Sequence, residues 1–249
     1  MLYVPFAVGA LAAGGAALEH LPALLALLGA ATGLFLGRES LLSWWRAHDR
    51  NQPTRSLAVA TVWQLGGAAI CASILFALRP PAALLPLVIA GGLVLGVHVA
   101  QMRRREGRTV FGEILAILGL GLAAPAAYTV GRWEWSSRAL WLWIVCVLFF
   151  ASSVLRVKVR ILAAQPRRAR DRGVLQRASI AYHIGLLLFF ASAGIVGWYP
   201  PLALVAFLPV IVSSLADLGT RPGRPNLVRT GLFEIAFSLW FLGFTVAAM

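Results

Sequence analysis

The chain has 249 residues, of which 60% are hydrophobic and only 12% carry a charge. Ordinary soluble domains have about a quarter charged residues, so this composition excludes a protein built around one soluble core. The formal net charge of +13 could suggest a nucleic-acid partner, but the basic cytoplasmic loops of a membrane protein give the same excess. The positions of the basic residues, described below, favour the membrane protein, and we expect no nucleic-acid partner.

Nine apolar segments follow one another along the chain, each close to the roughly 20 helical residues that cross a hydrocarbon core. We therefore predict an all-α membrane protein, a nine-helix bundle that forms a single membrane domain over residues 1–249. The eighth segment contains Pro209, which a bundled membrane helix tolerates. In chain order the predicted spans are residues 2–18, 21–37, 57–78, 82–101, 110–130, 139–157, 180–198, 201–217 and 230–248.

The 22 basic residues are unequally divided between the predicted loops. All except Arg79, Arg132 and Arg138 lie in or beside the loops that follow spans two, four, six and eight. Cytoplasmic loops of membrane proteins carry an excess of Arg and Lys. The distribution therefore predicts a cytoplasmic N-terminus and, because the number of spans is odd, an external C-terminus.

Ionisable side chains inside predicted spans are costly, so their positions are informative. They lie at a similar depth, about one helical turn from the cytoplasmic end of spans four to seven and nine. This common depth predicts a polar vestibule that faces the cytoplasm. The candidate ligand-binding residues in this layer are His98, Glu113, Arg156, Lys158, His183 and Glu234.

Two explanations of this polar layer remain open. Carboxylates and imidazoles can hold a cation, relay protons or pair with arginine, and arginines can bind an anionic headgroup. Alternatively, each side chain could reach the nearby interface, and a Glu near a helix N-terminus is favoured by the helix dipole. If Glu113 and Glu234 share one site, we expect replacement of either by Gln to weaken ligand binding while leaving stability nearly unchanged.

Several short motifs carry a resemblance to a known family. They are Val4-Pro-Phe-Ala-Val-Gly9, Gly112-Glu-Ile-Leu-Ala-Ile-Leu-Gly-Leu120, Ala123-Ala-Pro-Ala-Ala-Tyr128, the stretch from Phe149 to Arg160, and Gly231-Leu-Phe-Glu-Ile235. Together they resemble the YwiC-like family of bacterial integral membrane proteins, which implies a multi-pass protein of the bacterial cytoplasmic (inner) membrane. Such proteins usually open with a Pro-Lys-Glu-His-Gly-Ala-Trp motif, and Met1 stands where that motif would end. We expect either a start upstream of Met1 or a member that has lost the motif.

The nine-span layout is also similar to that of UbiA-type intramembrane prenyltransferases, whose site lies between two aspartate-rich loops after spans two and six. The first of these loops reads His48-Asp49-Arg50-Asn51-Gln52-Pro53 and resembles the end of that family's first motif, which adds Asp49 and Arg50 to the candidate ligand-binding residues. Magnesium–diphosphate chemistry needs clustered carboxylates. With Asp49 alone in one loop and Asp171 alone in the other, we expect no metal site and no conventional prenyltransferase.

Three classes of function remain, and no catalytic residue or cofactor is assigned in any of them. The favoured class is binding of a membrane lipid or of an isoprenoid or quinone-type ligand in the cytoplasm-facing vestibule. The alternatives are a metal-independent UbiA-like transferase and a small-solute or proton-coupled transporter. A transporter would favour inverted repeats and polar residues near the middle of the membrane, where Gln64 is the main polar side chain.

Overall fold

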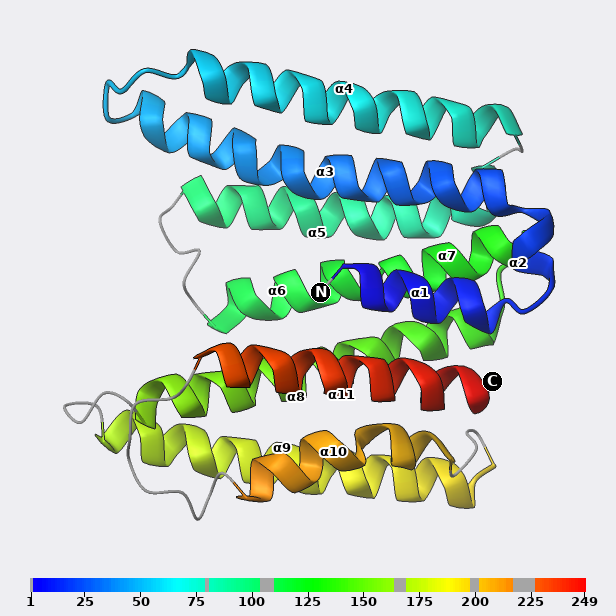
Figure 1. The fold of residues 1–249 in the computed structure, drawn as a ribbon, viewed down its shortest axis with the longest axis vertical. Coiled ribbons are helices and arrows are strands. Elements are labelled where there is room, and N and C mark those ends of the chain that lie inside the picture. The colour runs from blue at the N-terminus through cyan, green and yellow to red at the C-terminus, as the bar shows by residue number, and fades with distance from the viewer. Residues whose placement is uncertain (1, 79–80, 104–109, 164–168, 198–201, 217–226) are drawn as a thin grey trace. The chain divides into compact units, whose positions relative to one another are not determined.

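The structure, a computed structural model, describes residues 2–78, 81–103, 110–163, 169–197, 202–216 and 227–249 (Figure 1). The described residues form helices and turns, with no strand among them. The chain divides into two compact units, unit 1 (Met1–Ile144) and unit 2 (Val145–Met249).

Seven described segments are long and apolar enough to cross a membrane. They are Leu21–His48, Arg55–Leu78, Ala82–Gln101, Gly112–Arg132, Ser137–Leu162, Gly173–Ile195 and Val228–Ala247. The chain is thus an all-helical multi-pass membrane protein, as the sequence predicted. The predicted spans 2–18 and 201–217 contain the shorter apolar helices Tyr3–Ala12 and Ala203–Ala216, so the count of nine is not confirmed.

The described residues of unit 1 form eight helical elements and the start of a ninth. They are α1 (Tyr3–Ala12), α2 (Ala16–Glu19), α3 (Leu21–His48), α4 (Arg55–Leu78), the short 3-10 helix η1 (Pro81–Leu84), α5 (Leu85–Arg103), α6 (Val110–Gly121), α7 (Ala123–Arg132) and the beginning of α8 (Ser137–Ala163). Residues 2–18 therefore form two short helices in place of one continuous span. The break follows Ala13 at Gly14, whose φ of 68° belongs to the left-handed region.

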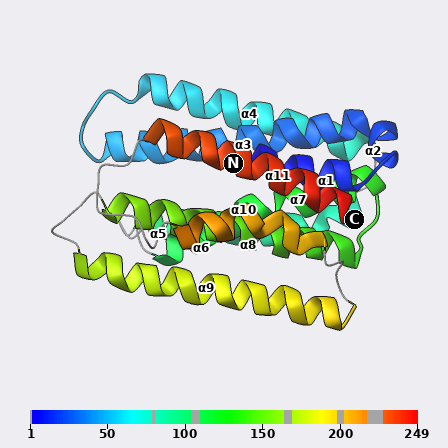
Figure 2. The same ribbon diagram turned by 60° about the horizontal axis from the view of Figure 1, so that its bottom comes forward.

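Helices α3 and α4 lie side by side in both views (Figures 1 and 2). Glycines at every fourth position of α3, Gly29, Gly33 and Gly37, face α4. A Cβ atom added to Gly33 would lie 2.8 Å from the carbonyl oxygen of Gln64 and 2.9 Å from Cβ of Ala68. Small residues let membrane helices approach closely without a hydrophobic driving force, and here they bring two backbones into contact.

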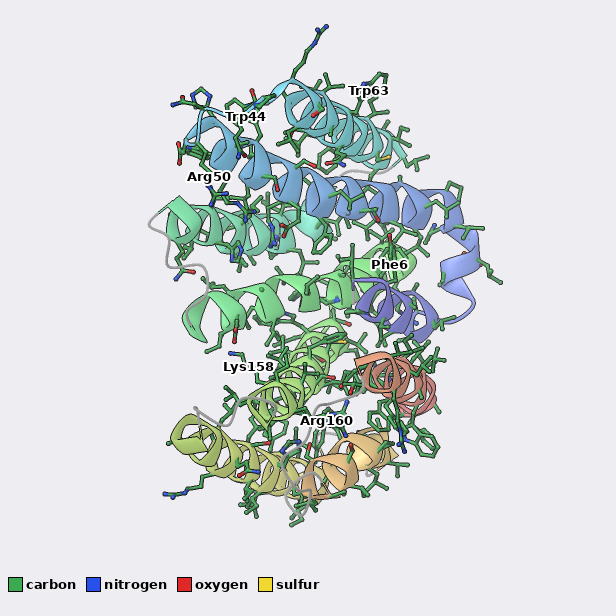
Figure 3. All side chains as sticks on the ribbon, turned by 60° about the vertical axis from the view of Figure 1, so that its left-hand side comes forward. Phe6, Trp44, Arg50, Trp63, Lys158 and Arg160 are labelled. Carbon is green, nitrogen blue, oxygen red and sulfur yellow. The ribbon has the colours of Figure 1, made fainter. Side chains whose placement is uncertain are left out.

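Helix α1 packs on α7 through small residues. A Cβ atom on Gly9 would overlap the backbone carbonyl of Ala124, and one on Gly131 would lie 2.7 Å from Cβ of Ala13. Val8 is fully buried at this contact, and Phe6, labelled in Figure 3, packs against the core of unit 1. The motifs Val4–Gly9 and Ala123–Tyr128, which are distant in sequence, therefore belong to helices that pack against each other.

Unit 2 contains the remainder of α8 together with α9 (Ala169–Ile195), α10 (Leu202–Ala216) and α11 (Leu227–Ala247). Each of these four helices contributes one phenylalanine to an aromatic core. The ring centroids of Phe149 and Phe241 are 4.0 Å apart and stacked, and that of Phe207 lies 4.8 Å from Phe190 and 5.7 Å from Phe241. All four rings are buried, so they hold the four helices of unit 2 together.

The helix ends alternate within each unit (Figure 1). In unit 1 the loop between α3 and α4 lies at the same end as the C-terminus of α5 and the N-terminus of α6. In unit 2 the C-termini of α8 and α10 lie at the same end as the N-termini of α9 and α11. We call these the basic ends, because the sequence places most Arg and Lys residues in the adjoining loops.

Candidate functional site

A cluster of polar side chains lies in unit 2, about one to three helical turns from the aromatic core toward the basic end. All four helices contribute to it, and most of its members are buried. We call it the polar cluster. Its residues are Ser152, Ser153 and Arg156 of α8, Ser179 and His183 of α9, Ser213 and Ser214 of α10, and Glu234 of α11.

The centre of the polar cluster is an ion pair between Arg156 and Glu234. Nη2 of Arg156 donates to one carboxylate oxygen of Glu234, and the hydroxyl of Ser153 donates to the other. The guanidinium also lies over the ring of Phe237, 4.5 Å from its centroid. Arg156 is only 1% exposed, so the carboxylate supplies the compensation that a buried cation requires.

A second arginine approaches the same place. Nη1 of Arg156 donates to Oγ of Ser213 at 3.0 Å, and Nη2 of Arg160 lies 3.4 Å from that same oxygen. Arg156 and Arg160 are four residues apart, which places them on one face of α8. Two guanidinium groups from α8 therefore converge on one hydroxyl of α10.

Lys158 lies on a different face of α8. It is two residues from both Arg156 and Arg160, which corresponds to about 200° around the helix axis. Figure 3 shows Lys158 and Arg160 on different sides of the α8 ribbon. The sequence placed Lys158 at the right depth, but the helix period separates it from the polar cluster.

His183 is enclosed by serines. Its Nδ1 lies 2.6 Å from the backbone carbonyl of Ser179, which can only accept, so Nδ1 carries the proton. Its Nε2 lies 2.7 Å from Oγ of Ser152 and 3.1 Å from Oγ of Ser214. With Nδ1 protonated, Nε2 of the neutral ring accepts from a serine hydroxyl, so the buried imidazole has a partner at each nitrogen.

His98 and Glu113, the other ionisable candidates, lie in unit 1. His98 of α5 is buried, and Glu113 is partly buried in the first turn of α6, where the helix dipole favours a carboxylate. Glu113 thus belongs to unit 1 and Glu234 to unit 2. A site shared by these two carboxylates stays a prediction.

Asp49 and Arg50 are exposed at the C-terminus of α3. The N–H of Gln52 donates to the carbonyl of Ala47, and that of Asn51 donates to the carbonyl of His48, while Asn51 has a φ of 52°. This is the Schellman arrangement, in which a residue in the left-handed conformation ends a helix. The residue types of the Asp-Arg-Asn-Gln-Pro stretch are therefore explained by the end of α3. Asn51 caps the helix, and Pro53 follows where the helix has ended.

A family model described as "YwiC-like protein" matches residues 1–128. The chain belongs to the YwiC-like family. No curated protein and no solved structure matches it. The family match confirms the resemblance noted in the sequence, whereas the similarity to UbiA-type enzymes stays a prediction.

The matched region of this YwiC-like protein ends in α7, inside unit 1. It includes the packed motifs Val4–Gly9 and Ala123–Tyr128 and the candidate residues Asp49, Arg50, His98 and Glu113. The polar cluster of unit 2 lies after it, so the properties of that cluster rest on its own geometry.

Sequence reasoning missed the five serines of the polar cluster. The signal was present in their spacing: Ser152 is four residues before Arg156, and Ser179 is four residues before His183, so each shares a helix face with an ionisable side chain. The pair Ser213-Ser214 interrupts the otherwise apolar run of α10. Small polar residues at helical spacing from a buried charge therefore mark the inward face.

Proposed function

We propose that this YwiC-like protein binds a membrane lipid or isoprenoid-type ligand, and that the phosphate-bearing head of this ligand binds at the polar cluster of unit 2. The convergence of Arg156 and Arg160 on Ser213 carries the proposal. Guanidinium groups present planar pairs of donors that match phosphate oxygens. Arg156 is buried and held by Glu234, whereas Arg160 is partly exposed and is the residue that an incoming headgroup would meet first.

The apolar part of such a ligand has a surface beside the polar cluster. Val212 and Leu215 of α10, which flank Ser213 and Ser214, are 61% and 53% exposed. In a membrane protein, exposed apolar side chains of this kind lie against acyl or prenyl chains. A ligand with its head at Ser213 can therefore rest its chain on α10.

The two alternative functions are supported less well. For a transferase, Glu234 is poorly placed as a base, because Arg156 and Ser153 already bond its two oxygens. For a proton-coupled transporter, one observation is favourable: His183 has bonding partners at both ring nitrogens in the interior of unit 2. A proton flux in vesicles that depends on His183 would favour that second candidate.

Replacing Arg160 by Gln should weaken the binding of phosphate-bearing lipids about tenfold or more, because it removes a charged donor worth about 1.5–3 kcal/mol. The measurement is native mass spectrometry of the full chain with added phosphatidylglycerol, together with identification of the lipids that copurify. Arg177→Gln is the matched control, since Arg177 is an exposed arginine of α9 in the same unit.

Equal losses in both variants would mean that the effect is general surface electrostatics, and retention of the lipid by Arg160→Gln would contradict the proposed site. Copurification of a neutral quinone that is retained equally by both variants would also contradict the phosphate-bearing head.

We further propose that the protein crosses the bacterial cytoplasmic membrane nine times as one membrane domain, with its N-terminus in the cytoplasm and a UbiA-like order of spans. Seven long apolar helices, the shorter apolar helices α1 and α10 and the unequal distribution of basic residues support this topology. Within each unit the helices alternate in direction, so the helix termini that adjoin the basic loops lie at the same end, and this agrees with the topology.

A fusion of alkaline phosphatase to the C-terminus should therefore be active, because the enzyme needs the oxidising side of the membrane to form its disulfides. Fusions within residues 103–108 or 167–177 should be inactive. A cytoplasmic reporter such as green fluorescent protein at the same three positions provides the control, since its signal should be reversed. Phosphatase activity at either basic loop would contradict the nine-span topology.

A further inference from the structure

Helix α10 contains an internal proline, Pro209, at its middle position. Proline has no N–H, so it cannot donate to the carbonyl four residues earlier, which belongs to Val205. That carbonyl accepts instead from Nε1 of Trp240 on α11, at 2.9 Å. The helices α8, α9 and α11 have no proline. Because sharp bends in helices occur mainly at proline, α10 is the helix of unit 2 whose sequence provides a hinge.

The two halves of α10 are held in different ways. In the first half, the ring of Phe207 packs against aromatic rings of α9 and α11. In the second half, the hydroxyls of Ser213 and Ser214 bond side chains of α8 and α9. Buried Val210 and Ile211 also pack there, but lipid tails are as apolar as these side chains. The hydrogen bonds therefore contribute much of what holds the second half in place.

The hydroxyl oxygen of Ser213 lies where a phosphate oxygen would suit the surrounding charges. Nη1 of Arg156 donates to it at 3.0 Å, and Nη2 of Arg160 lies 3.4 Å from it. Guanidinium groups that converge on one oxygen are typical of phosphate recognition. Arg156 is only 1% exposed, so a headgroup reaches this donor after Ser213 has moved away.

We propose that the second half of α10, Val210–Ala216, is a gate over the polar cluster, with Pro209 as its hinge and Ser213 as an autoinhibitory contact. In the closed state, Ser213 accepts from both arginines. In the open state this half moves away from α8, and a phosphate oxygen of the lipid headgroup replaces the hydroxyl of Ser213. Trp240 keeps the first half on α11 during this movement. The gate rests on the proposed function, because it describes how the phosphate-bearing head enters that site.

Replacing Ser213 by Ala separates an autoinhibitory serine from a serine that binds the ligand. The closed state loses hydrogen bonds that the open state does not have, so the full chain in detergent should bind phosphatidylglycerol about twofold to tenfold more tightly. The measurement is a lipid titration by native mass spectrometry. Ser192→Ala is the matched control, since this exposed serine of α9 bonds a carbonyl of its own helix. Unchanged or weaker binding by Ser213→Ala would overturn the gate.

A second measurement needs no ligand. Amide hydrogen exchange reports local opening, and without added lipid the amides of residues 210–216 should exchange faster in Ser213→Ala than in the wild type. In Pro209→Ala they should exchange more slowly, because the new N–H can bond the carbonyl of Val205 and remove the hinge. Pro86→Ala is the control, since this exposed proline lies in the first turn of α5 in unit 1. Equal exchange in all four proteins would contradict a moving second half.

The two measurements also separate failure of the gate from failure of the proposed site. If Arg160→Gln weakens lipid binding but neither α10 variant changes the exchange of residues 210–216, the site stands and the gate is wrong. If the exchange changes as expected while Arg160→Gln retains its lipid, the movement of α10 is supported and the phosphate-bearing ligand is contradicted.

Discussion

Replacing Arg156 by Met should lower the free energy of unfolding by about 3–5 kcal/mol, the usual result of removing one partner from a buried ion pair. Arg156 is almost fully buried, and its loss leaves the carboxylate of Glu234 with Ser153 but without its cation. The expected loss of stability is large because the carboxylate of Glu234 remains in the interior of unit 2 without its cation.

A second substitution separates this effect from lost packing. Arg156→Met combined with Glu234→Leu removes both charges, and buried pairs replaced by apolar residues are often neutral or stabilising. We therefore expect the double variant to recover most of the loss, measured as melting temperature in detergent. Arg177→Met is the control for removal of an exposed arginine in the same unit. An Arg156→Met protein that melts like the wild type would show that the ion pair does not stabilise unit 2.

The structure changes one expectation that came from the sequence. Taken as the lining of an open vestibule, Glu234 should tolerate replacement by Gln with little loss of stability. Because the structure pairs Glu234 with the buried Arg156, we now expect Glu234→Gln to destabilise the protein. Glu113 is partly buried on α6 in the other unit, so for Glu113→Gln the earlier expectation stands.

Of the ionisable residues that the sequence singled out by depth, Arg156, His183 and Glu234 lie in the polar cluster, whereas His98 and Glu113 lie in unit 1. Arg156 and Glu234 lie about two turns from the basic ends of α8 and α11, whereas His183 lies near the middle of α9, because α9 begins at Ala169, well before the predicted start of span seven at residue 180. The serines could not be assigned in the same way. A serine in a membrane helix can bond the carbonyl four residues before it, as Ser73 does with Ala69, so its presence alone does not show which way it faces.

The long helices of the fold could be predicted from the sequence, whereas their interruptions could not. The length of an apolar segment identifies α3, α4 and α11, but it does not predict where a helix ends. Helix α3 continues to His48, well past the predicted end of span two, because residues 39–48 contain neither Gly nor Pro. The break between α6 and α7 precedes Pro125, which has no N–H to donate to the carbonyl four residues earlier. Hydropathy is insensitive to both features.

Gly9→Ala should destabilise the protein although it adds a single methyl group. The added Cβ would overlap the backbone carbonyl of Ala124, and a backbone atom in a packed helix has little room to move. Overpacking of this kind costs about 1–3 kcal/mol, which outweighs the gain of up to about 1 kcal/mol that Ala gives over Gly inside a helix. We expect a lower melting temperature in detergent, because α1 must move away from α7.

The same substitution at an open position gives the opposite sign and is the decisive control. Gly67 lies inside α4 with nothing within 4 Å of its added Cβ, so Gly67→Ala gains the helix preference of Ala without a clash and should leave the melting temperature unchanged or raise it. The difference in melting temperature between the two variants therefore reports on the contact between α1 and α7. This contact joins the motifs Val4–Gly9 and Ala123–Tyr128. If Gly9→Ala and Gly67→Ala melt alike, the first helix does not pack on α7 through Gly9, and the short helix α1 needs another contact to hold it in unit 1.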